Sequence, residues 1–513
     1  MSRSPRPRLA ALVALGLVAT IPATAGAEDG FLTDEPAMLT LDASAPAGSQ
    51  LVPIINSGEE IGGFMFEGIP DGIGGKGGGG DTVDVFVNHE QSRVPFAGLA
   101  DLVDSSVSRL TLDAATGAVL DTAVPIPSSA GFLRFCSATM AGPREGLDRR
   151  LFFTGEESPD IVDVPAGAPY GPDPQLGSQR QGGYAVVLNP RNGEYTQVPG
   201  MGRHNHENSM VVPGGWDQVA VLSGDDTFFN QPFPDWSQLY LYLADDSNAI
   251  VDDEGRLFAF QVTRTEDGPV DPGDPFNEAN DYGDITTGDH WRGRFIPVPE
   301  DVAKGLTAET PQDGLENWSN AHNVFQFIRV EDTAYDPNNR RVVYVADTGD
   351  RRMVADPATG RLTRNSSAGP FGPYPNGRVF KMRFDRENPR RVIDFSILLN
   401  ADTGGENNPA VLHQPDNMGT SPRSLMVQED TTQLPGSRVW NYDFSSKEWS
   451  VVAQVNDIAW ESSGIVSAAP WFGRGWWLLD VQAHNVFIDQ EVVGAVTYKR
   501  EAGQLLLMKI PGS

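Results

Sequence analysis

One feature constrains the fold more than any other: short β-rich runs recur along the whole chain, and each ends in polar, often acidic, residues. They include DVFVNHE (84–90), RLFFTGEE (150–157), QVAVLSGDD (218–226), QLYLYLADD (238–246), RVVYVADTGD (341–350), SLMVQEDT (424–431) and WWLLDVQAH (476–484). Such runs are either alternating or continuously apolar, which is typical of half-buried or fully buried strands. The 55 glycines and 39 prolines supply the turns between them. We therefore predict an all-β protein.

Many short strands at this spacing favour a β-propeller, in which radial closure leaves few sheet edges exposed. An array of β-sandwiches is the competing architecture, but it would normally show linkers. No long Ser/Gly or Pro-rich tract divides this chain, and GGKGGGG (74–80) is interpreted as one loop tip. Amphipathic helical patterns are scarce, DVAKGL (301–306) being the best. Residues 28–513 are thus expected to form one propeller domain with long inter-strand loops.

The first residues have the pattern of a general secretory signal. MSRSPRPR carries three arginines and no acid, an apolar run follows, and AGA (25–27) fits a small-residue cleavage site. Further along, no stretch approaches the roughly 18 apolar residues of a membrane span. This predicts a signal peptide over 1–27 and a periplasmic or extracellular protein, with an uncleaved anchor as the minor alternative.

The chain is strongly acidic, with a formal net charge of −31. Such a charge repels nucleic acid and anionic membrane surfaces, so neither is an expected partner. Disorder is one way to carry this much acid. However, 39% hydrophobic residues and ten tryptophans indicate a packed core instead.

Acidic clusters follow the strand runs in sequence: NHE (88–90), TGEE (154–157), GRHNHEN (202–208), SGDD (223–226), FIRVED (327–332), HQPDN (413–417) and VQED (427–430). Oxygen-rich clusters suit calcium, whereas His, Cys and carboxylates together suit a transition metal. A single cluster is more often a turn or a solvated strand end. Seven of them together favour a site that binds cations.

Cys136, in LRFCSATM (133–140), is the chain's single cysteine. It has no partner for a disulfide, and an exposed thiol outside the cytoplasm is prone to oxidation. Two interpretations stay open on these grounds: a buried cysteine that acts as a small hydrophobe, or a metal ligand.

Taken in order, the motifs resemble the PhoX-type alkaline phosphatases, a family of secreted or periplasmic bacterial phosphoesterases. The resemblance runs from about residue 50 to the C-terminus. It is carried by VNHE (87–90), FCSATMAG (135–142), TGEE (154–157), GRHNHE (202–207), SGDD (223–226), IRVEDTAYDP (328–337), QPDNMG (414–419), MVQED (426–430), ESSGI (461–465) and LLDVQAH (478–484). It implies a six-bladed propeller with two ferric irons and several calcium ions at one end of the central channel.

The resemblance also implies roles for particular residues. Cys136 matches the family's iron-ligating cysteine, and Arg329 matches the arginine that holds substrate phosphate. A planar guanidinium suits this role, because a cage of carboxylates alone would repel a phosphate dianion. The implied metal-bridging carboxylates are Glu207, Glu331 and Asp416, and the further candidates for metal ligands are Glu90, Glu156, Glu157, Asp226 and Glu429. Histidines 89, 204, 206, 322 and 413 are expected to be structural, since oxygen ligands dominate in this family.

We therefore expect a monomeric, metal-dependent phosphomonoesterase that acts on small phosphoesters by attack of a metal-activated oxygen. The alternatives are a phytase-like, phosphodiesterase or lactonase-like propeller hydrolase, and a secreted calcium-binding propeller without activity. Three departures mark a divergent member of the family. The leader lacks a twin-arginine pair, and FCSATMAG lacks the Asn that often precedes the cysteine. In GDDTFFNQPFPDWSQLYLY (224–242), the insertion between the Asp pair and the strand is longer than expected. No GxSxG, Walker, HExxH or CxxC motif supports another hydrolytic chemistry.

Overall fold

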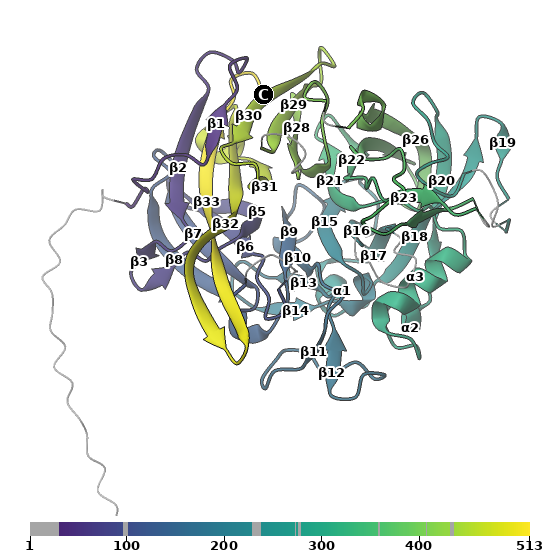
Figure 1. Ribbon diagram of the computed structural model, residues 1–513, viewed down its shortest axis with the longest axis horizontal. Coiled ribbons are helices and arrows are strands. Elements are labelled where there is room, and N and C mark those ends of the chain that lie inside the picture. The colour runs from purple at the N-terminus through teal and green to yellow at the C-terminus, as the bar shows by residue number, and fades with distance from the viewer. Residues whose placement is uncertain are drawn as a thin grey trace, which may run out of the picture.

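Successive apolar runs pair as antiparallel meanders arranged around a common centre (Figure 1). The computed structural model describes residues 30–95, 101–227, 237–271, 273–274, 279–357, 360–406, 408–430 and 436–513. The predicted signal peptide, residues 1–27, lies outside the described residues. As the sequence predicts, the protein is almost entirely β and has a propeller-like fold.

The meanders are units of four strands, named here by number in chain order. Unit 1 holds β5 (Pro70–Gly79), β6 (Thr82–His89), β7 (Ser106–Asp113) and β8 (Val119–Ile126). Unit 2 holds β9 (Phe135–Ala141), β10 (Leu151–Glu156), β13 (Ala185–Leu188) and β14 (Tyr195–Gln197). Unit 3 holds β15 (His206–Val212), β16 (Val219–Asp225), β17 (Leu239–Ala244) and β18 (Arg256–Thr265).

Unit 4 holds β21 (Val330–Asp336), β22 (Asn339–Asp347), β25 (Arg378–Phe384) and β26 (Arg391–Asn400). Unit 5 holds β27 (Pro415–Thr420), β28 (Ser424–Glu429), β29 (Arg438–Asp443) and β30 (Trp449–Val455). Unit 6 holds β31 (Glu461–Ser467), β32 (Trp476–Val493), β33 (Val496–Lys509) and β2 (Gln50–Asn56). β1 (Leu39–Leu41) pairs with β30, and β20 (Trp291–Pro297) joins β18 to β26.

The first strand of each unit lies at the centre of the molecule (Figure 1). These inner strands contact one another in a closed ring, in the order β5, β9, β15, β21, β27, β31 and back to β5. N-terminal strands complete the last units, because β2 pairs with β33 and β1 with β30. Strands far apart in sequence thus complete the units that close the ring.

Each sheet is buried on both faces, and this explains the continuously apolar runs. In β17, Leu239, Leu241 and Leu243 pack toward unit 4, while Tyr240 and Tyr242 pack toward unit 2. Six hydrophobic clusters of this kind lie between neighbouring units, including one between units 6 and 1. The core is therefore divided into radial wedges between neighbouring units, around a central channel.

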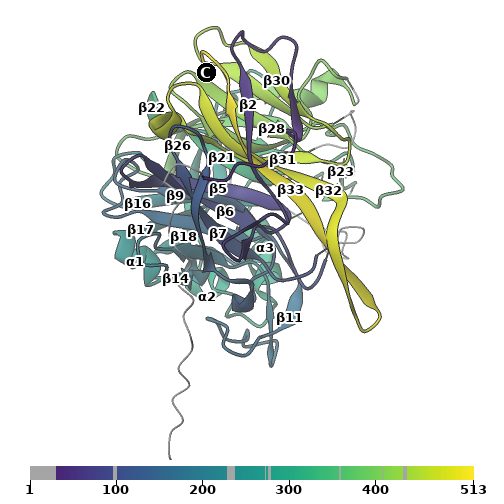
Figure 2. The ribbon, with the colours of Figure 1, turned by 90° about the vertical axis from the view of Figure 1, so that its left-hand side faces the viewer.

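The remaining elements are short and peripheral. They are β3 (Glu60–Ile61), β4 (Phe64–Met65), β11 (Ile161–Asp163), β12 (Gln179–Gln181), β19 (Gly268–Pro269), β23 (Met353–Ala355), β24 (Leu362–Arg364), α1 (Ser247–Val251), α2 (Glu300–Ala303), α3 (Pro311–Ala321), α4 (Ala469–Phe472) and the 3-10 turns Ser128–Ala130, Pro199–Met201 and Ala401–Gly404. The ends of β32 and β33 form a hairpin that projects from the body (Figure 2). None of the helices in the described part of the chain is long and apolar enough for a membrane crossing.

Two expectations need correction. The segment GGKGGGG was interpreted as a loop tip, but Gly74–Gly79 belong to β5. Glycine is needed there because Phe152 and the Trp471 ring lie where the Cβ atoms of Gly74 and Gly75 would be, within 2.7 and 2.3 Å. The longest helix, α3, was missed although its sequence carries two signals. Pro311 stands at the first turn, and Pro311, Leu315 and Trp318 follow a helical spacing.

Candidate metal centre

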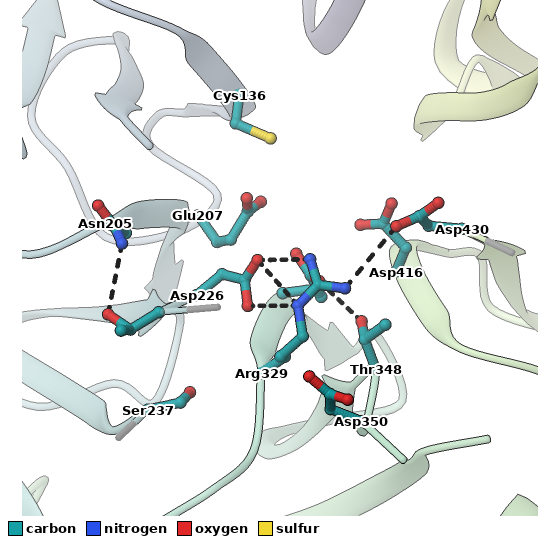
Figure 3. Close-up of polar contacts among 12 residues, drawn as sticks. Cys136, Asn205, Glu207, Asp226, Ser237, Arg329, Thr348, Asp350, Asp416 and Asp430 are labelled. Carbon is teal, nitrogen blue, oxygen red and sulfur yellow. Dashed lines mark hydrogen bonds and ion pairs between the residues drawn. The ribbon is translucent and has the colours of Figure 1, made fainter. Parts of the chain in front are cut away.

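Five of the six inner strands place a carboxylate or thiol side chain at the same end of the channel. In five of them the second residue of the strand has a carboxylate or thiol side chain: Asp71 in β5, Cys136 in β9, Glu207 in β15, Glu331 in β21 and Asp416 in β27. Figure 3 shows Cys136, Glu207 and Asp416 directed from different units into one space. This equivalence explains why the motifs recur at similar intervals in the sequence.

A shift in strand register accompanies these residues. In β15 the pairing with β16 is irregular between His206 and Ser209, and β5, β21 and β27 show the same irregularity at the equivalent place. A β-bulge re-aims side chains, so that two consecutive residues can face the same side. Both Glu207 and Asn208 therefore reach the channel, where strict alternation would allow only one of them.

In units 1 to 5 the second strand ends in a pair of polar residues, and the two side chains of a pair have different contacts. The first carboxylate of a pair accepts a backbone N–H from the segment that leads into its own inner strand. Glu156 accepts from Leu133 at 2.7 Å, Asp347 accepts from Ile328 at 2.8 Å, and Glu429 accepts from His413 at 2.8 Å. Each donor stands two residues before its inner strand, so this carboxylate fixes where that strand begins.

The second member of each pair faces the channel. Glu90, Glu157 and Asp226 belong to clusters with the inner-strand residues. In each of three clusters, oxygen or sulfur atoms lie within 4.8 Å of one another: Asp71–Glu90–Cys136, Cys136–Glu157–Glu207 and Glu207–Asp226–Glu331. Shared members join the clusters into one continuous array. Of the sequence-predicted ligands, the array brings together Cys136, Glu207, Glu331, Glu90, Glu157 and Asp226.

Three of the predicted ligands are not members of these clusters: Asp416, which is buried beside Glu331 and Asp430, and the two carboxylates Glu156 and Glu429. The Glu156 carboxylate is held by Arg180 at 2.6 Å, and the Glu429 carboxylate by Arg438 at 2.7 Å, with every one of these side chains buried. The sequence suggests Glu156 and Glu429 as candidate ligands, whereas the structure shows each of them in a buried ion pair with an arginine. The physical reason is the alternation of a strand end, which turns consecutive residues to opposite sides.

Sequence reasoning also missed two residues of the centre. Asp71 follows Pro70 at the start of β5, just as Asp416 follows Pro415 at the start of β27, and this repeated Pro-Asp was the available signal. Asp430 directly follows Glu429 and faces Asp416 and Arg329, as Figure 3 shows. Its signal was the second place in an acidic pair, the place that Glu157 and Asp226 also hold.

The carboxylates of the array repel one another, and bound cations would stabilise their charged forms. Burial raises the pKa of Glu207 well above its usual range, and the charges of Glu331 and Glu157 raise it further. Burial likewise raises the pKa of Glu157 and Asp416, to which nearby carboxylates add. The Oε1 atom of Glu207 is buried without a hydrogen-bond partner in the described chain. Bound cations would reverse this repulsion and supply the missing partner, so the donor set fits metal ions.

Cys136 lies at the junction of two of the clusters. Its thiol donates a hydrogen bond to Oδ2 of Asp71 at 3.2 Å. Burial raises the thiol pKa well above its usual value, and the charges of Asp71 and Glu207 add to that effect. A cation beside the sulfur would favour the thiolate instead. Of the two interpretations left open by the sequence, this surrounding of carboxylates fits a ligand better than an apolar core cysteine.

Arg329 is the basic side chain that lies among these carboxylates. Its Nε and Nη2 atoms donate to the Asp226 carboxylate at 2.9 and 2.6 Å, and Nη2 also lies 2.8 Å from Glu331 (Figure 3). Nη1 faces Asp430 at 3.8 Å. Asp226 thereby fixes the plane of the guanidinium at the edge of the array. The simpler alternative, a surface arginine paired with Asp332, is wrong, because Asp332 bonds Asn208 and the Met418 amide.

Three of the histidines expected to be structural, His89, His206 and His413, are hydrogen-bonded to neighbouring groups of the protein. His89 pairs through Nε2 with Ser108 at 2.8 Å, His206 through Nδ1 with Ser223 at 2.9 Å, and His413 with the Asn408 carbonyl at 2.8 Å. None of the histidines is a member of the three clusters found among the described residues. His204 is buried 4.0 Å from Asp225 and packs against the rings of His206 and Tyr240.

Comparison with known proteins points to one family. The family described as "Alkaline phosphatase PhoX" matches residues 162–444, and no curated protein matches the chain. Among solved structures, Pseudomonas fluorescens PhoX in complex with vanadate, a transition state analogue, is 14% identical and has a TM-score of 0.60. That match covers 92% of this chain and 98% of the other. The periplasmic gluconolactonase PpgL of Pseudomonas aeruginosa is 12% identical, covers 77% of this chain and 87% of its own, and has a TM-score of 0.34.

Proposed function

The chain belongs to the alkaline phosphatase PhoX family and is a metal-dependent phosphomonoesterase, and from this premise we propose how its residues divide the work. The observation that carries the proposal is the buried array itself, in which carboxylates and one thiol from different units converge beside Arg329. A phosphoester hydrolase needs such a combination, because the phosphate dianion must be bound and then stabilised as its charge shifts.

We assign the metal ligands by their place in the two rows of channel-facing residues. The inner-strand row contributes Asp71, Cys136, Glu207, Glu331 and Asp416, and the second-strand row contributes Glu90, Glu157, Asp226 and Asp430. The carboxylates suit calcium, and the thiolate of Cys136 suits iron better than calcium. Two iron ions and several calcium ions, as in the family, are the proposed complement. Bound there, the metals would supply positive charge for the phosphoryl oxygens and lower the pKa of water.

Arg329 is proposed to bind the phosphoryl group of the substrate. The hydrogen bonds to Asp226 leave the guanidinium little freedom to rotate, so its remaining edge is held toward the space that Asp430 and Asp416 border. A preorganised donor costs no reorganisation when charge builds on the equatorial oxygens of the transition state. Glu331 is itself oriented by the Thr348 hydroxyl, which donates to its Oε1 at 2.8 Å.

Export and domain organisation complete the proposal. We propose that residues 1–27 are cleaved and that 28–513 act as one domain, with each four-stranded unit serving as one blade. Mass spectrometry of the protein recovered from the medium or the periplasm should give a mature chain that begins at residue 28. A full-length mass there would show that the leader is kept.

The test of function is Arg329→Ala, with Arg351→Ala as the matched control. Arg351 is exposed, pairs with the surface residue Glu406 and lies over the ring of Phe371, away from the clusters. We expect Arg329→Ala to keep its metals and to lose about 10²–10³-fold in kcat/KM on p-nitrophenyl phosphate, by analogy with the loss of one oxyanion donor. Inhibition by product phosphate should weaken in parallel, and the control should match the wild type.

The outcome separates the possible roles. Wild-type turnover by Arg329→Ala, with metals retained, would refute the phosphate-binding role. Loss of metals in the same variant would instead assign Arg329 to holding Asp226. Turnover of bis(p-nitrophenyl) phosphate faster than of the monoester would favour a phosphodiesterase over a phosphomonoesterase.

A further inference from the structure

A cavity opens at the end of the channel opposite the metal centre. It has a volume of about 770 Å³ and is lined by all six inner strands. The metal-centre residues stand at the second position of these strands, whereas the cavity is lined from the third position onward. Strands advance about 3.3 Å per residue, so Thr420 lies roughly 13 Å along β27 from Asp416. A volume of this size falls in the range of small-molecule sites.

A layer of hydrogen-bonded side chains separates the cavity from the metal centre. Ser137 donates to Oε2 of Glu207 at 2.9 Å, and Asn417 donates to Oγ of Ser137 at 3.1 Å. Asn208 donates to Asp332, whose other oxygen accepts from the Met418 amide at 2.6 Å. Because these side chains satisfy one another, the layer forms a polar floor for the cavity.

The walls above this floor are apolar and adaptable. Three methionines, Met140, Met210 and Met418, come from different inner strands, and Ile465 and Trp471 add an aliphatic and an aromatic surface. Methionine side chains fit ligands of irregular shape and make favourable contacts with aromatic rings. The Trp471 ring lies flat against the glycine surface of β5, where a Cβ on Gly75 would lie 2.3 Å from it.

Positive charge gathers at the mouth. Arg144, Arg423 and Arg474 line the cavity, and all three are exposed. Within the described part of the chain, no hydrogen bond or ion pair is formed by any of these three guanidinium groups. Asp332, already bonded on the floor, is the one Asp or Glu side chain in the lining. Acidic residues greatly outnumber basic ones in this chain, whose net charge is −31. Three neighbouring arginines without a carboxylate partner among the described residues are therefore unexpected, and they suggest that the opening binds an anion.

We propose that this cavity binds a small amphipathic anion, with an aromatic or aliphatic body among the methionines and Trp471 and an anionic head group on the three arginines. An apolar interior with a few convergent charges is the usual composition of an organic ligand site. Guanidinium groups recognise carboxylate, sulfonate and phosphate head groups by paired hydrogen bonds. The site is separate from the array that holds Arg329 and does not depend on the proposed catalytic roles.

Calorimetric titration of the metal-loaded protein with naphthalene-2-sulfonate tests the proposal. We expect one equivalent to bind, and 2-naphthylmethylammonium, with the same body and the opposite charge, not to bind. The variant Arg144→Glu/Arg423→Glu/Arg474→Glu should weaken binding about tenfold or more. The matched control Arg191→Glu/Arg292→Glu/Arg386→Glu changes three exposed arginines elsewhere by the same charge and should bind as the wild type does.

Two further measurements separate this site from the metal centre and from misfolding. Arg329→Ala, which changes the metal centre alone, should leave the sulfonate affinity unchanged. Val466→Trp, which fills the wall from a half-buried position, should abolish binding while the circular dichroism and phosphatase rate stay those of the wild type. The proposal is overturned if the sulfonate does not bind, if Arg329→Ala abolishes its binding, if the ammonium analogue binds equally, or if the rim variant keeps full affinity.

Discussion

Glu156→Gln and Glu157→Gln are adjacent changes for which the structure predicts opposite results. The Glu156 carboxylate accepts four hydrogen bonds: from the amides of Leu133 and Tyr184 at 2.7 and 3.1 Å, and from Arg180 at 2.6 and 2.7 Å. Both side chains of the Glu156–Arg180 pair are 0% exposed. Glu157 lies instead in the cluster with Cys136 and Glu207.

The magnitude follows from what glutamine cannot do at position 156. Each carboxylate oxygen accepts one backbone N–H and one guanidinium N–H, and the amide nitrogen of glutamine accepts neither. Two of the four bonds are lost, and the buried Arg180 keeps its charge without a counter-ion. Removing one partner of a buried ion pair costs about 3–5 kcal/mol. We expect the free energy of unfolding to fall by that amount, with the metal content unchanged.

At position 157 the same substitution should raise, rather than lower, the free energy of unfolding of the metal-free protein. Burial, together with the charge of Glu90, raises the pKa of Glu157 well above its usual range, so at neutral pH the ionised carboxylate is disfavoured in the metal-free fold. Glutamine relieves that cost. Glu157→Gln should therefore unfold at higher denaturant concentration than the wild type when both are metal-free, and should retain less metal when purified without chelator.

Two measurements decide the matter. Guanidinium unfolding in excess chelator reports the stability of each metal-free protein, and elemental analysis of the untreated proteins reports their metal content. If Glu156→Gln loses metal and its metal-free unfolding midpoint equals that of the wild type, Glu156 is a ligand. The division of acidic pairs into a structural and a channel-facing member would then be wrong.

Three further predictions concern the metals and pH. Cys136→Ser should lose iron while its circular dichroism stays that of the wild type, and stoichiometric iron in this variant would exclude the thiolate as a ligand. Excess EGTA should lower both the activity and the melting temperature, because the ligands come from separate units and bind only in the folded state; an unchanged melting curve would argue against calcium there. Burial lowers the pKa of His89 to about 4, so between about pH 4 and 6.5 the unfolded chain binds more protons and acidification destabilises the fold. His89→Gln should reduce the slope of unfolding free energy against pH by up to about 1.4 kcal/mol per unit, and an unchanged slope would show that His89 is protonated in the fold.

Much of the architecture could be predicted because short apolar runs in the sequence indicate buried strands. Runs such as LYLYLADD and RLFFTGEE have no polar face, and a strand of that kind must be covered on both sides. A ring of sheets packed face to face satisfies this requirement in every unit, as Leu241 and Tyr242 illustrate by packing toward different neighbours. α3 escaped prediction because its apolar face is short: Leu315 and Trp318 are its large apolar residues, and several of its other buried residues are polar.

The candidate site could be predicted in part for a similar reason. Residues at the start of inner strands carry their own signature, so Cys136, Glu207 and Asp416 were found from the order of the motifs. The second-strand ends were harder, because Glu156 and Glu157 are chemically identical and only their direction separates their roles. For example, the sequence pattern suggested Glu429 as a metal ligand, whereas its neighbour Asp430 is the residue that faces Arg329 in the channel.

The sequence by itself thus determined that the chain forms short buried strands, that acids gather at their ends, and that one thiol and Arg329 lie among them. Residue type and hydrophobic periodicity decide these features, and both are properties of the unfolded chain. Which acid faces the channel was decided only by the tertiary structure. The direction of a side chain at a strand end depends on the register with the partner strand, and register shifts beside Asp71, Glu207, Glu331 and Asp416 are set by contacts between units. The same closure brought Asp71 beside Cys136 from 65 residues away.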